Sequence, residues 1–405
     1  MLMKLPKGMR DFLPQQMMQR EKIFSTVAEV YREFGFQPLE TPALEYLATL
    51  RAKSGDEIAG QLFEIKDSEL ALRFDLTVPL SRVAANMQFP QPFKRYQIGP
   101  VWRREEPQKG RFREFWQADA DVIGSSSMRT EAELLDVAST ALLRVGFGKF
   151  EILLSNRKIL NSIIEKFKLE EKANGIFRVL DKADKIGKEE VERQLAPFFG
   201  TDAKDVLPLF FMRGSNERKL SAFEEYAPEG VREVREIMDY YPKFTFDPLI
   251  IRGLGYYSGP VYEFRAEGFT GSFAGGGRYD GLLGIYGRGA PAAGISLGVE
   301  RMLMLMGEGD GKKTYTEVFV ASFPGTYPNA VEAADKLRKA GICTETDLME
   351  RNLRKQLDYA SALSIPWVII LGKKEVEAKK VNLRDMQRGK EELLSIQEAI
   401  KRIKG

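Results

Sequence analysis

Residues 93–124 constrain the fold of this chain more than any other stretch of its sequence. An apolar, aromatic-rich run at residues 93–102 and a second run at residues 112–123 flank a charged loop at residues 103–111. Both runs are rich in residues that favour strands, and the loop contains Pro107 and Gly110. The pattern therefore predicts a long β-hairpin.

The tip of this predicted hairpin is unusually charged. Its charged residues are Arg103, Arg104, Lys109, Arg111 and Arg113 together with Glu105, Glu106 and Glu114. A rigid antiparallel pair of strands that presents arginines from one end can grip a polyphosphate. The same charges also suit a solvated, charge-balanced tip, so the segment by itself leaves both interpretations open.

The chain contains no histidine among its 405 residues. This absence excludes Ser-His-Asp and Cys-His nucleophile pairs, histidine general bases and histidine metal sites. Any chemistry must therefore use arginines, carboxylates, tyrosines, backbone amides or a bound cation. Phosphoryl or nucleotidyl transfer, which depends on positioning and charge stabilisation, remains compatible with the composition.

A chain of this length is too long for one ordinary core, so we expect two or three domains. No apolar run approaches the roughly 20 residues that span a bilayer, and the N-terminus lacks a signal-peptide pattern. The single cysteine, Cys343, excludes an intrachain disulfide and suits a reducing compartment. We therefore expect a cytoplasmic protein without a membrane partner. The net charge of +3 neither demands nor excludes nucleic acid.

Capping and periodicity predict helices and strands on both sides of the hairpin. Thr130 and Glu133 have the spacing of a capping box before a helix that Gly146 ends. An apolar stripe at residues 19–34 predicts a helix that stops at Gly35. Further elements are expected at residues 62–65, 70–75 and 150–154 as strands and at residues 78–88 as a helix. From about residue 160 to residue 243, few glycines and a helical periodicity predict a helical insertion, although alternating charges also suit solvated helix faces.

The last part of the chain follows a glycine-rich segment. Residues 307–313 read GEGDGKK, which has the composition of a flexible linker, and the glycine spacing differs from that of a phosphate-binding loop. We expect a first domain at residues 1–306, a linker at 307–314 and a second domain at 315–405. Strands at 318–322, 343–346, 367–371 and 380–385 alternate with helices at 329–339 and 352–363 before a terminal helix, which predicts an α/β domain with a largely parallel sheet.

Glycine-bearing segments accompany arginines between the helical region and the linker. Three glycines at 275–277 precede Arg278 and Tyr279, so the backbone can approach a ligand while we expect both side chains to reach into a pocket. Arg252 precedes Tyr256 and Tyr257, which offer aromatic walls beside a cation. At residues 294–301, glycines lead into a helix whose first turn carries Glu300 and Arg301.

These segments resemble the signature motifs of class II aminoacyl-tRNA synthetases. The hairpin with Arg103, Glu105 and Phe115 resembles motif 2, residues 294–301 resemble motif 3, and residues 36–44 resemble motif 1. Within the class, the segments similar to those that distinguish histidyl-tRNA synthetase are residues 7–14, 72–77, 252–257 and 272–283. The resemblance covers the whole chain, because residues 347–353 are similar to part of the family's anticodon-binding module.

The resemblance implies a fold and an activity. The fold would be an α+β catalytic core, a mainly antiparallel sheet flanked by helices with a helical insertion, plus a C-terminal α/β anticodon-binding domain. The activity would be that of a histidine–tRNA ligase, which activates L-histidine with ATP to histidyl-adenylate and transfers it to tRNA(His). A homodimer is implied, and Mg²⁺ would bridge the ATP phosphates, although no motif supplies protein ligands for a metal.

The resemblance also implies site residues. Arg103 and Arg252 would be catalytic, on opposite sides of the α-phosphate. The implied ATP contacts are Arg103, Glu105, Arg111, Phe115 and Arg301. The implied histidine contacts are Asp75, Thr77, Arg103, Gln117, Asp121, Arg252, Tyr256, Tyr257 and Tyr279, of which Asp75, Thr77 and Gln117 would bind the α-amino group and Asp121, Tyr257 and Tyr279 would line the imidazole pocket. Candidate tRNA contacts are Arg351, Arg354, Lys355, Lys373 and Lys374, residue types that on helices are often merely solvated.

Elementary chemistry agrees with this assignment. A carboxylate is already ionised at pH 7, so its attack on the α-phosphate needs no general base. The reaction needs two anions forced together, which arginines around the phosphorus can do. Residues 115, 117, 119 and 121 alternate with their neighbours, so they fall on one face of the second hairpin strand.

Two alternatives remain open. A non-catalytic paralogue, such as a regulatory subunit of ATP phosphoribosyltransferase, resembles the synthetase core but lacks the C-terminal domain and loses ATP-binding arginines. A class II ligase for another amino acid is disfavoured by the tyrosines at 256, 257 and 279. The sequence departs from the family where Gly255 replaces an acidic residue, which puts the fine positioning of Arg252 in doubt.

Overall fold

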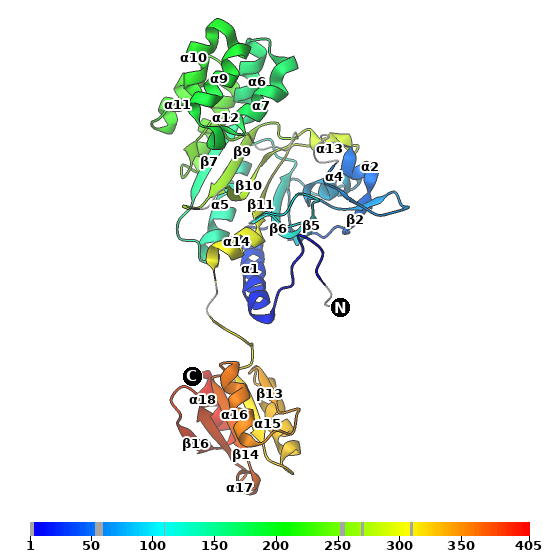
Figure 1. Cartoon of the computed structure of the whole chain (residues 1–405), viewed down its shortest axis with the longest axis vertical. Helices are drawn as coiled ribbons and strands as arrows, with labels where there is room; N and C mark the ends of the chain where they lie inside the picture. Colours follow the sequence, from blue (N-terminus) through cyan, green and yellow to red (C-terminus); the bar gives the residue numbers. More distant parts are fainter. Residues whose placement is uncertain (1–3, 53–59, 109, 252–255, 269–270, 308–310) are drawn as a thin grey trace. The chain divides into compact units, whose positions relative to one another are not determined.

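The structure, a computed structural model, describes residues 4–52, 60–108, 110–251, 256–268, 271–307 and 311–405. The chain divides into two compact units. Unit 1 comprises Met1–Asp11 with Arg20–Gly307, and unit 2 comprises Phe12–Gln19 with Glu308–Gly405. Figure 1 shows the elements of both units. In the part of the chain that is described, no helix combines the length and the apolar character needed to cross a membrane.

Unit 1 is built on an eight-stranded sheet with the order β1-β5-β6-β11-β10-β9-β7-β8. Neighbouring strands are antiparallel except in the two edge pairs, β1 with β5 and β7 with β8. The strands are β1 (Gln37–Pro38), β5 (Phe93–Trp102), β6 (Glu114–Ile123), β7 (Glu151–Asn156), β8 (Thr245–Phe246), β9 (Pro260–Arg265), β10 (Ser272–Arg278) and β11 (Ala292–Gly298). The predicted mainly antiparallel core is confirmed.

The predicted hairpin is the pair β5–β6. Its register runs from Phe93 opposite Ile123 to Trp102 opposite Glu114. Because side chains alternate along a strand, β6 presents residues 117, 119 and 121 to one face and Ala118, Ala120 and Val122 to the other. The second set packs in the main core with α1 (Pro14–Glu33) and α5 (Arg129–Val145). The polar set therefore faces away from these helices.

The start of α5 differs from the prediction. No side-chain hydrogen bond caps this helix, and its N-cap residue is Met128. The Thr130 hydroxyl instead donates to Ser125 Oγ at 3.0 Å, and Glu133 forms an ion pair with Lys94. The predicted capping box is therefore wrong, because partners outside the helix take both side chains. The predicted end is confirmed, since Gly146 caps α5 with a left-handed φ of 118°.

The chain between β7 and β8 is helical, as predicted. Figure 1 shows these helices gathered in one cluster next to β7 and β9. They are α6 (Arg157–Lys166), α7 (Ala173–Leu180), α8 (Ala183–Ile186), α9 (Lys188–Phe199), α10 (Ala203–Phe210), α11 (Asn216–Phe223) and α12 (Pro228–Tyr240), with short 3₁₀ turns at Glu170–Lys172 and Gly200–Asp202. The limits of the insertion and of the two domains stay predictions.

A small sheet and several short helices complete unit 1. The sheet has the order β2-β4-β3 and positions the connection from β4 to α4, which carries Asp75. The helix that follows β4 in the sequence, α4, begins at Thr77. These elements are β2 (Leu44–Tyr46), α2 (Leu47–Arg51), β3 (Phe63–Glu64), β4 (Leu70–Leu72) and α4 (Thr77–Asn86), followed much later by α13 (Leu282–Ile285) and α14 (Val299–Met306).

Unit 2 contains a five-stranded sheet with the order β13-β12-β14-β15-β16. The first two pairs are parallel and the last two are antiparallel, so the predicted largely parallel sheet is in fact mixed. The reason is that short connections, through α17 (Lys373–Glu377) from β14 to β15 and through a turn from β15 to β16, join these strands, whereas parallel neighbours need a long crossover. Its elements are β12 (Val318–Ser322), α15 (Tyr327–Lys339), β13 (Thr344–Thr346), α16 (Leu353–Ala362), β14 (Trp367–Leu371), α17 (Lys373–Glu377), β15 (Val381–Asp385), β16 (Glu391–Leu394) and α18 (Ile396–Lys404).

Candidate active site

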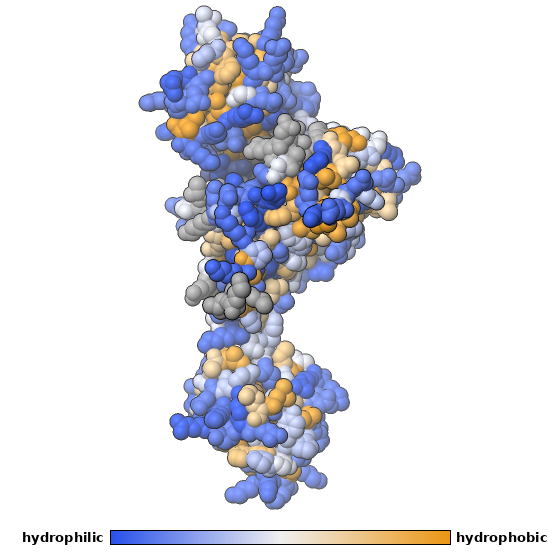
Figure 2. All heavy atoms as spheres, turned by 45° about the vertical axis from the view of Figure 1, so that its right-hand side comes forward, coloured by the Kyte–Doolittle hydropathy of each residue, from blue (hydrophilic) through white to orange (hydrophobic). Residues whose placement is uncertain are grey.

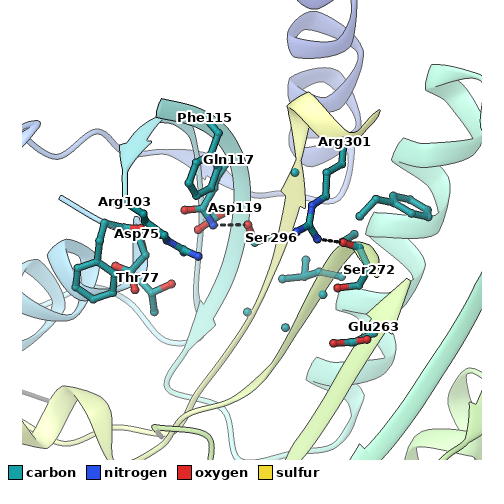
Figure 3. A pocket seen from close by; sticks show the side chains of 18 of the residues that line it. Asp75, Thr77, Arg103, Phe115, Gln117, Asp119, Glu263, Ser272, Ser296 and Arg301 are labelled. Atoms are coloured by element: carbon teal, nitrogen blue, oxygen red, sulfur yellow. Dashed lines mark hydrogen bonds between the residues drawn. The ribbon is translucent and has the colours of Figure 1, made fainter. Parts of the chain in front are cut away.

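A cavity of about 460 Å³ lies on the polar face of the large sheet. Its walls come from the β4–α4 connection, from the loop between β5 and β6, from β6, β9, β10 and β11, and from the start of α14. Figure 3 shows Asp75 and Thr77 beside Arg103, the side chains of β6 along the middle, and Arg301 with Ser272 across from them. Segments that are far apart in the sequence therefore meet around one space.

The cavity collects almost every residue that the resemblance implied for ATP and histidine. The predicted residues that line it are Asp75, Thr77, Arg103, Glu105, Arg111, Phe115, Gln117, Asp121, Tyr256, Tyr257, Tyr279 and Arg301. Arg252 lies outside the described residues, as does Gly255. The structure brings the described members of the set together, and their individual roles remain predictions.

Glycines keep the floor of the cavity open. Gly294 on β11 stands opposite Asp121 on β6, and a Cβ atom at Gly294 would lie 2.0 Å from Asp121 Oδ1. A Cβ atom at Gly276 on β10 would lie 1.9 Å from the Gly294 carbonyl oxygen. Real Cβ atoms do not tolerate such distances, so both strands need glycine at these positions.

Arg103 stands at the end of β5 with its side chain tied to the β4–α4 connection. Its Nε donates to the Phe74 carbonyl at 3.0 Å, and its guanidinium lies 5.0 Å from the centre of the Phe115 ring. The backbone N–H of Arg103 donates to the Arg113 carbonyl at 2.8 Å, which extends the hairpin pairing beyond β6. The guanidinium is thus held at the cavity wall next to an aromatic ring.

Arg301 enters the cavity from α14 on the opposite side (Figure 3). Its Nη1 donates to the Ser272 carbonyl on β10. The preceding residue, Glu300, accepts from the Trp116 backbone N–H at 2.7 Å and from Arg20 Nη2 at 3.0 Å. This buried carboxylate therefore joins α14, α1 and β6, and it orients the helix turn that carries Arg301.

The charged hairpin tip has ion pairs of its own and also borders the cavity, and its binding of a polyphosphate stays a prediction. Arg111 Nη1 lies 3.3 Å from Glu105 Oε2, and Lys7 Nζ lies 2.8 Å from Glu106 Oε2. Glu105 and Arg111 nevertheless also line the cavity. The tip is charge-balanced and, at the same time, forms one wall of the site.

Three buried aspartates lie deeper in the cavity. Asp75 lies just before α4, where its Oδ1 accepts from the Val78 N–H of the first turn at 2.9 Å, and burial raises its pKa to about 6. Burial and the nearby charge of Asp121 raise the pKa of Asp119 to about 7. Burial also raises the pKa of Asp121, which the guanidinium of Arg95 opposes. The cavity is therefore rich in acceptors and in negative charge.

Of these three aspartates, Asp121 is the one that two other side chains hold, Tyr279 and Arg95. Its Oδ1 accepts from the Tyr279 hydroxyl at 2.5 Å, and its Oδ2 lies 2.8 Å from Nη2 of the fully buried Arg95. Tyr256 packs edge-on against Tyr279 with ring centres 5.9 Å apart. Carboxylate and phenol thus form a rigid polar end within an aromatic wall.

One predicted orientation is wrong. Arg278 does not line the cavity; it is buried and pairs with Glu131 of α5 through Nε–Oε1 at 2.7 Å and Nη2–Oε2 at 2.9 Å. The reason is the alternation of side chains along β10, which turns Arg278 toward α5. Tyr279 follows the strand and does reach the cavity.

Sequence reasoning assigned no role to several cavity residues. Asp119 and Ser296 face each other in the β6–β11 register, and Glu263 on β9 lines the cavity as well. The alternation of polar residues along β6 was the signal for Asp119. Ser296 and Glu263 carry no signal in the sequence, because the sheet order alone brings their strands to the site.

The predicted tRNA contacts lie in unit 2. Arg351 is tied down, because its Nε lies 2.6 Å from Asp347 Oδ1 and its guanidinium lies 4.3 Å from the centre of the Tyr359 ring. Arg354 and Lys355, in the first turn of α16, are exposed. Lys373 and Lys374, in the first turn of α17, are exposed as well. The geometry therefore distinguishes four accessible cations from one that is already engaged.

Comparisons with known proteins agree with this architecture. Residues 8–302 match the family Histidyl-tRNA synthetase, and residues 317–405 match the family Anticodon binding domain. Histidine--tRNA ligases of Porphyromonas gingivalis and Korarchaeum cryptofilum are 38% and 37% identical to the chain, and both alignments cover 96% of this chain and 96% of the relative. The crystal structure of histidyl-tRNA synthetase from Nostoc sp. PCC 7120 superposes with a TM-score of 0.87 at 29% identity, covering 100% of this chain and 99% of that one.

A more distant structure shares the fold alone. It is described as an ATP phosphoribosyltransferase regulatory subunit/histidyl-tRNA synthetase from Bacillus halodurans, and it superposes with a TM-score of 0.78 at 21% identity. An antiparallel sheet with an arginine-bearing hairpin and a glycine-led helix is the arrangement of a class II aminoacyl-tRNA synthetase. The chain belongs to the histidyl-tRNA synthetase family.

Proposed function

We propose that this protein is a histidine–tRNA ligase, which joins L-histidine to tRNA(His) at the expense of ATP. The observation that carries the proposal is the cavity itself. It holds arginines at one end, with Arg103 and Arg301 on opposite walls, and buried acceptors at the other end, with Asp75, Gln117 and Asp121. The first end suits a triphosphate and the second suits an amino acid.

In the activation step, the histidine carboxylate attacks the α-phosphate of ATP and displaces pyrophosphate. The attacking oxygen is already anionic, so the protein supplies no general base, in agreement with a chain without histidine. Arg103 would hold both the carboxylate and the α-phosphate, and so offset the repulsion between two anions. Arg252 would act from the other side of the phosphorus, a role carried over from the family resemblance.

The nucleotide would lie between the hairpin and α14. Phe115 offers a ring on which adenine can stack, Glu105 offers a carboxylate to the adenine amino group, and Arg301 and Arg111 are cations for the outer phosphates. Among the described residues, no group of three potential metal ligands gathers in one place. Mg²⁺ commonly binds through substrate phosphates and only one or two carboxylates, so the proposed reaction does not need such a group.

The imidazole ring would lie at the end formed by Asp121, Tyr279 and Tyr257. A ring nitrogen that carries a proton needs an acceptor, and the carboxylate of Asp121 is fixed there by Tyr279 and Arg95. A site built to bond a polar group rejects amino acids without that group, because its own buried atoms would stay unpaired. This geometry favours histidine over proline, glycine or threonine.

In the transfer step, a terminal hydroxyl of tRNA attacks the adenylate, and a phosphate oxygen can accept its proton. Unit 2 would bind the anticodon, since residues 317–405 match an anticodon-binding family. Arg354 and Lys355 are the better candidates for tRNA contact, because Arg351 is already paired with Asp347. We also propose a cytoplasmic location, which the single cysteine, Cys343, suits.

A homodimer would be formed through apolar side chains that unit 1 leaves exposed. Figure 2 shows apolar atoms gathered over the part that carries α2, α4 and α13. The exposed apolar residues there are Leu44, Tyr46, Ile65, Met87 and Ile285. Scattered apolar residues are normal on a surface, but a gathered set supports a protein interface. The molar mass in solution, measured by light scattering, tests this part of the proposal.

The regulatory-paralogue alternative is weaker. A fold shared with the Bacillus halodurans structure does not separate the two functions. The described ATP-site arginines are present, and the anticodon-binding family covers the end of the chain. Both features support a ligase, because a non-catalytic paralogue needs neither.

The test is amino-acid-dependent exchange of pyrophosphate into ATP with each standard amino acid. Exchange with histidine alone is expected. Arg103→Ala should reduce it by about 10²- to 10³-fold, the scale for losing one charge-stabilising group, whereas Arg104→Ala, a neighbour outside the cavity, serves as the matched control. Exchange with no amino acid at all would favour the regulatory paralogue, and exchange with a different amino acid would reassign the specificity.

A further inference from the structure

We propose that Asp119 is a binding residue for the α-ammonium group of the amino acid substrate, acting together with Asp75 and Gln117. The proposal rests on the proposed function and adds a residue that the family resemblance did not assign. Asp119 lies on β6 between Gln117 and Asp121, its relative exposure is 2%, and its side chain lines the cavity. Figure 3 shows it beside Gln117 and Ser296.

The first step is to ask which buried acceptors still lack a donor. Among the described residues, four cavity-lining acceptors are buried without a hydrogen-bond partner: Asp75 Oδ2, Gln117 Oε1, Asp119 Oδ1 and Asp121 Oδ2. Asp121 Oδ2 is nevertheless neutralised within the chain by Arg95 Nη2 at 2.8 Å, which leaves the other three. A buried acceptor without a donor is unfavourable, because it has lost its water without replacement. Three such atoms around one cavity therefore indicate a ligand that brings several donors.

The second step separates Asp119 from its neighbour. Asp121 already accepts from Tyr279 and lies against the guanidinium of Arg95. The side chain of Ser296, opposite Asp119 in the register, accepts from Gln117 Nε2 at 2.7 Å. This bond turns the Gln117 amide so that its oxygen is the atom left over. Asp119 thus stands between an open amide oxygen and a carboxylate whose partners are in place.

The third step matches the ligand. An ammonium group carries three N–H donors and a positive charge, whereas a neutral imidazole ring carries one N–H donor. Two carboxylate oxygens and one amide oxygen complement the ammonium in number and in charge. The imidazole end of the cavity is already defined by Asp121 and Tyr279. The open oxygen of Asp119 is therefore assigned to the ammonium.

The experiment compares the intact protein with its Asp119→Asn variant in histidine-dependent pyrophosphate exchange. Asparagine keeps the shape and removes the charge. The KM for histidine should rise by about 10- to 100-fold, the scale of a hydrogen bond to a charged group, while the KM for ATP should change less than about twofold. Asp136→Asn, an exposed aspartate on α5 outside the cavity, is the matched control and should change neither constant.

Two substrate analogues decide which part of histidine Asp119 contacts. Histamine keeps the ammonium and lacks the carboxylate, and 3-(imidazol-4-yl)propionate lacks the ammonium. In Asp119→Asn, inhibition by histamine should weaken in step with the KM for histidine, while inhibition by imidazolylpropionate should stay the same. Equal weakening for both analogues would assign Asp119 to the ring and overturn the proposal.

Other outcomes are equally decisive. An unchanged KM for histidine, or a parallel rise in the KM for ATP, would give Asp119 a structural role only. If Asp119→Asn does not fold, Asp119→Ser provides the same comparison with a smaller polar group. Failure of the wild-type protein to exchange with histidine would reject the proposed function itself, which is a result distinct from normal exchange in the variant.

Discussion

Two buried carboxylates in unit 1 lie on opposite sides of the large sheet and differ in their hydrogen-bond partners. Glu131 on α5 receives two hydrogen bonds from the guanidinium of Arg278, and both side chains are almost fully buried. Asp119 on β6 is buried to the same degree, but one of its oxygens has no hydrogen-bond partner in the part of the chain that is described. Both residues are expensive to bury as anions.

This difference distinguishes a carboxylate with a structural role from one with a ligand-binding role. A buried charge whose partner lies in the same chain fixes the packing of two elements, here α5 against β10. A buried charge without such a partner is tolerated where a ligand supplies the missing donor, and perturbed carboxylates gather at functional sites for this reason. A buried carboxylate can thus have a structural or a ligand-binding role, and the location of its partner decides which role it has.

The largest effect is expected from breaking the structural pair. Glu131→Ala leaves the guanidinium of Arg278 buried without its partner, which should lower the free energy of unfolding by about 3–5 kcal/mol. Denaturant unfolding followed by circular dichroism measures it. Glu33→Ala, which removes an exposed partner of Arg144, is the control. A loss no larger than that of the control would contradict the structural role.

The next largest effect concerns the nucleotide end of the cavity. Arg301→Ala should reduce histidine-dependent exchange by about 10²-fold or more while leaving the unfolding midpoint unchanged, because a preorganised charge near the phosphates acts on the reaction. Rates measured over a range of ATP concentrations test it. Arg288→Ala, an exposed arginine outside this cavity, is the control. If the variant lost stability as well as activity, Arg301 would have a structural role like that of Arg278.

A substitution at Asp119 is expected to have a smaller effect on stability, and to raise it instead of lowering it. Its pKa of about 7 lies above the unfolded value of about 3.9, so between these values the folded protein binds more protons and becomes less stable as the pH rises. Asp119→Asn should therefore raise the unfolding midpoint at pH 8 and have less effect at pH 5. Burial and the charges of Asp121 and Asp75 raise this pKa, whereas the charge of Arg95 and a hydrogen bond with Ser296 lower it.

Thermal unfolding at the two pH values provides the measurement. The variant would thus be a more stable protein and a poorer binder of histidine. A lower unfolding midpoint at pH 8 would show that the Asp119 carboxylate stabilises the unliganded fold, and the contrast with Glu131 would disappear.

The smallest effect is expected where both charges are exposed. Lys7 and Glu106 form an ion pair whose side chains are 68% and 72% exposed. Water and salt screen such a pair, so Lys7→Ala should have an unfolding midpoint that cannot be distinguished from that of the wild type. Differential scanning calorimetry at low and high salt tests this. A clear loss at either salt concentration would mean that Lys7 orders the hairpin tip.

Local patterns predicted the elements well where each element supplies its own signal. The pairing of β5 with β6 as a hairpin follows from two apolar runs around a turn, and the end of α5 follows from Gly146. The capping box at Thr130 failed because Ser125 and Lys94, from outside the helix, hold its two members. Local propensity is overridden when a tertiary partner offers a better bond.

The candidate site was predicted less evenly. Nearly all the described residues that the family resemblance named line the cavity, and the alternation along β6 placed residues 117, 119 and 121 on one face. The sequence could not show which way the Arg278 side chain turns, because its partner Glu131 lies 147 residues away in the chain. Ser296 was missed for the same reason, since only the pairing of β11 with β6 brings it to Asp119.

By itself, the sequence determined the chemistry that is possible here: no histidine, arginines next to glycines, and a strand with acidic residues on one face. Only the tertiary structure decided which charges neutralise each other and which stay open. Hydrogen bonds and ion pairs act over a few ångströms, and the strand order β6-β11-β10-β9 sets those distances between residues that are remote in the chain. Arg278 and Asp119 are both charged residues that the fold buries, and the sheet made one structural and left the other open to a ligand.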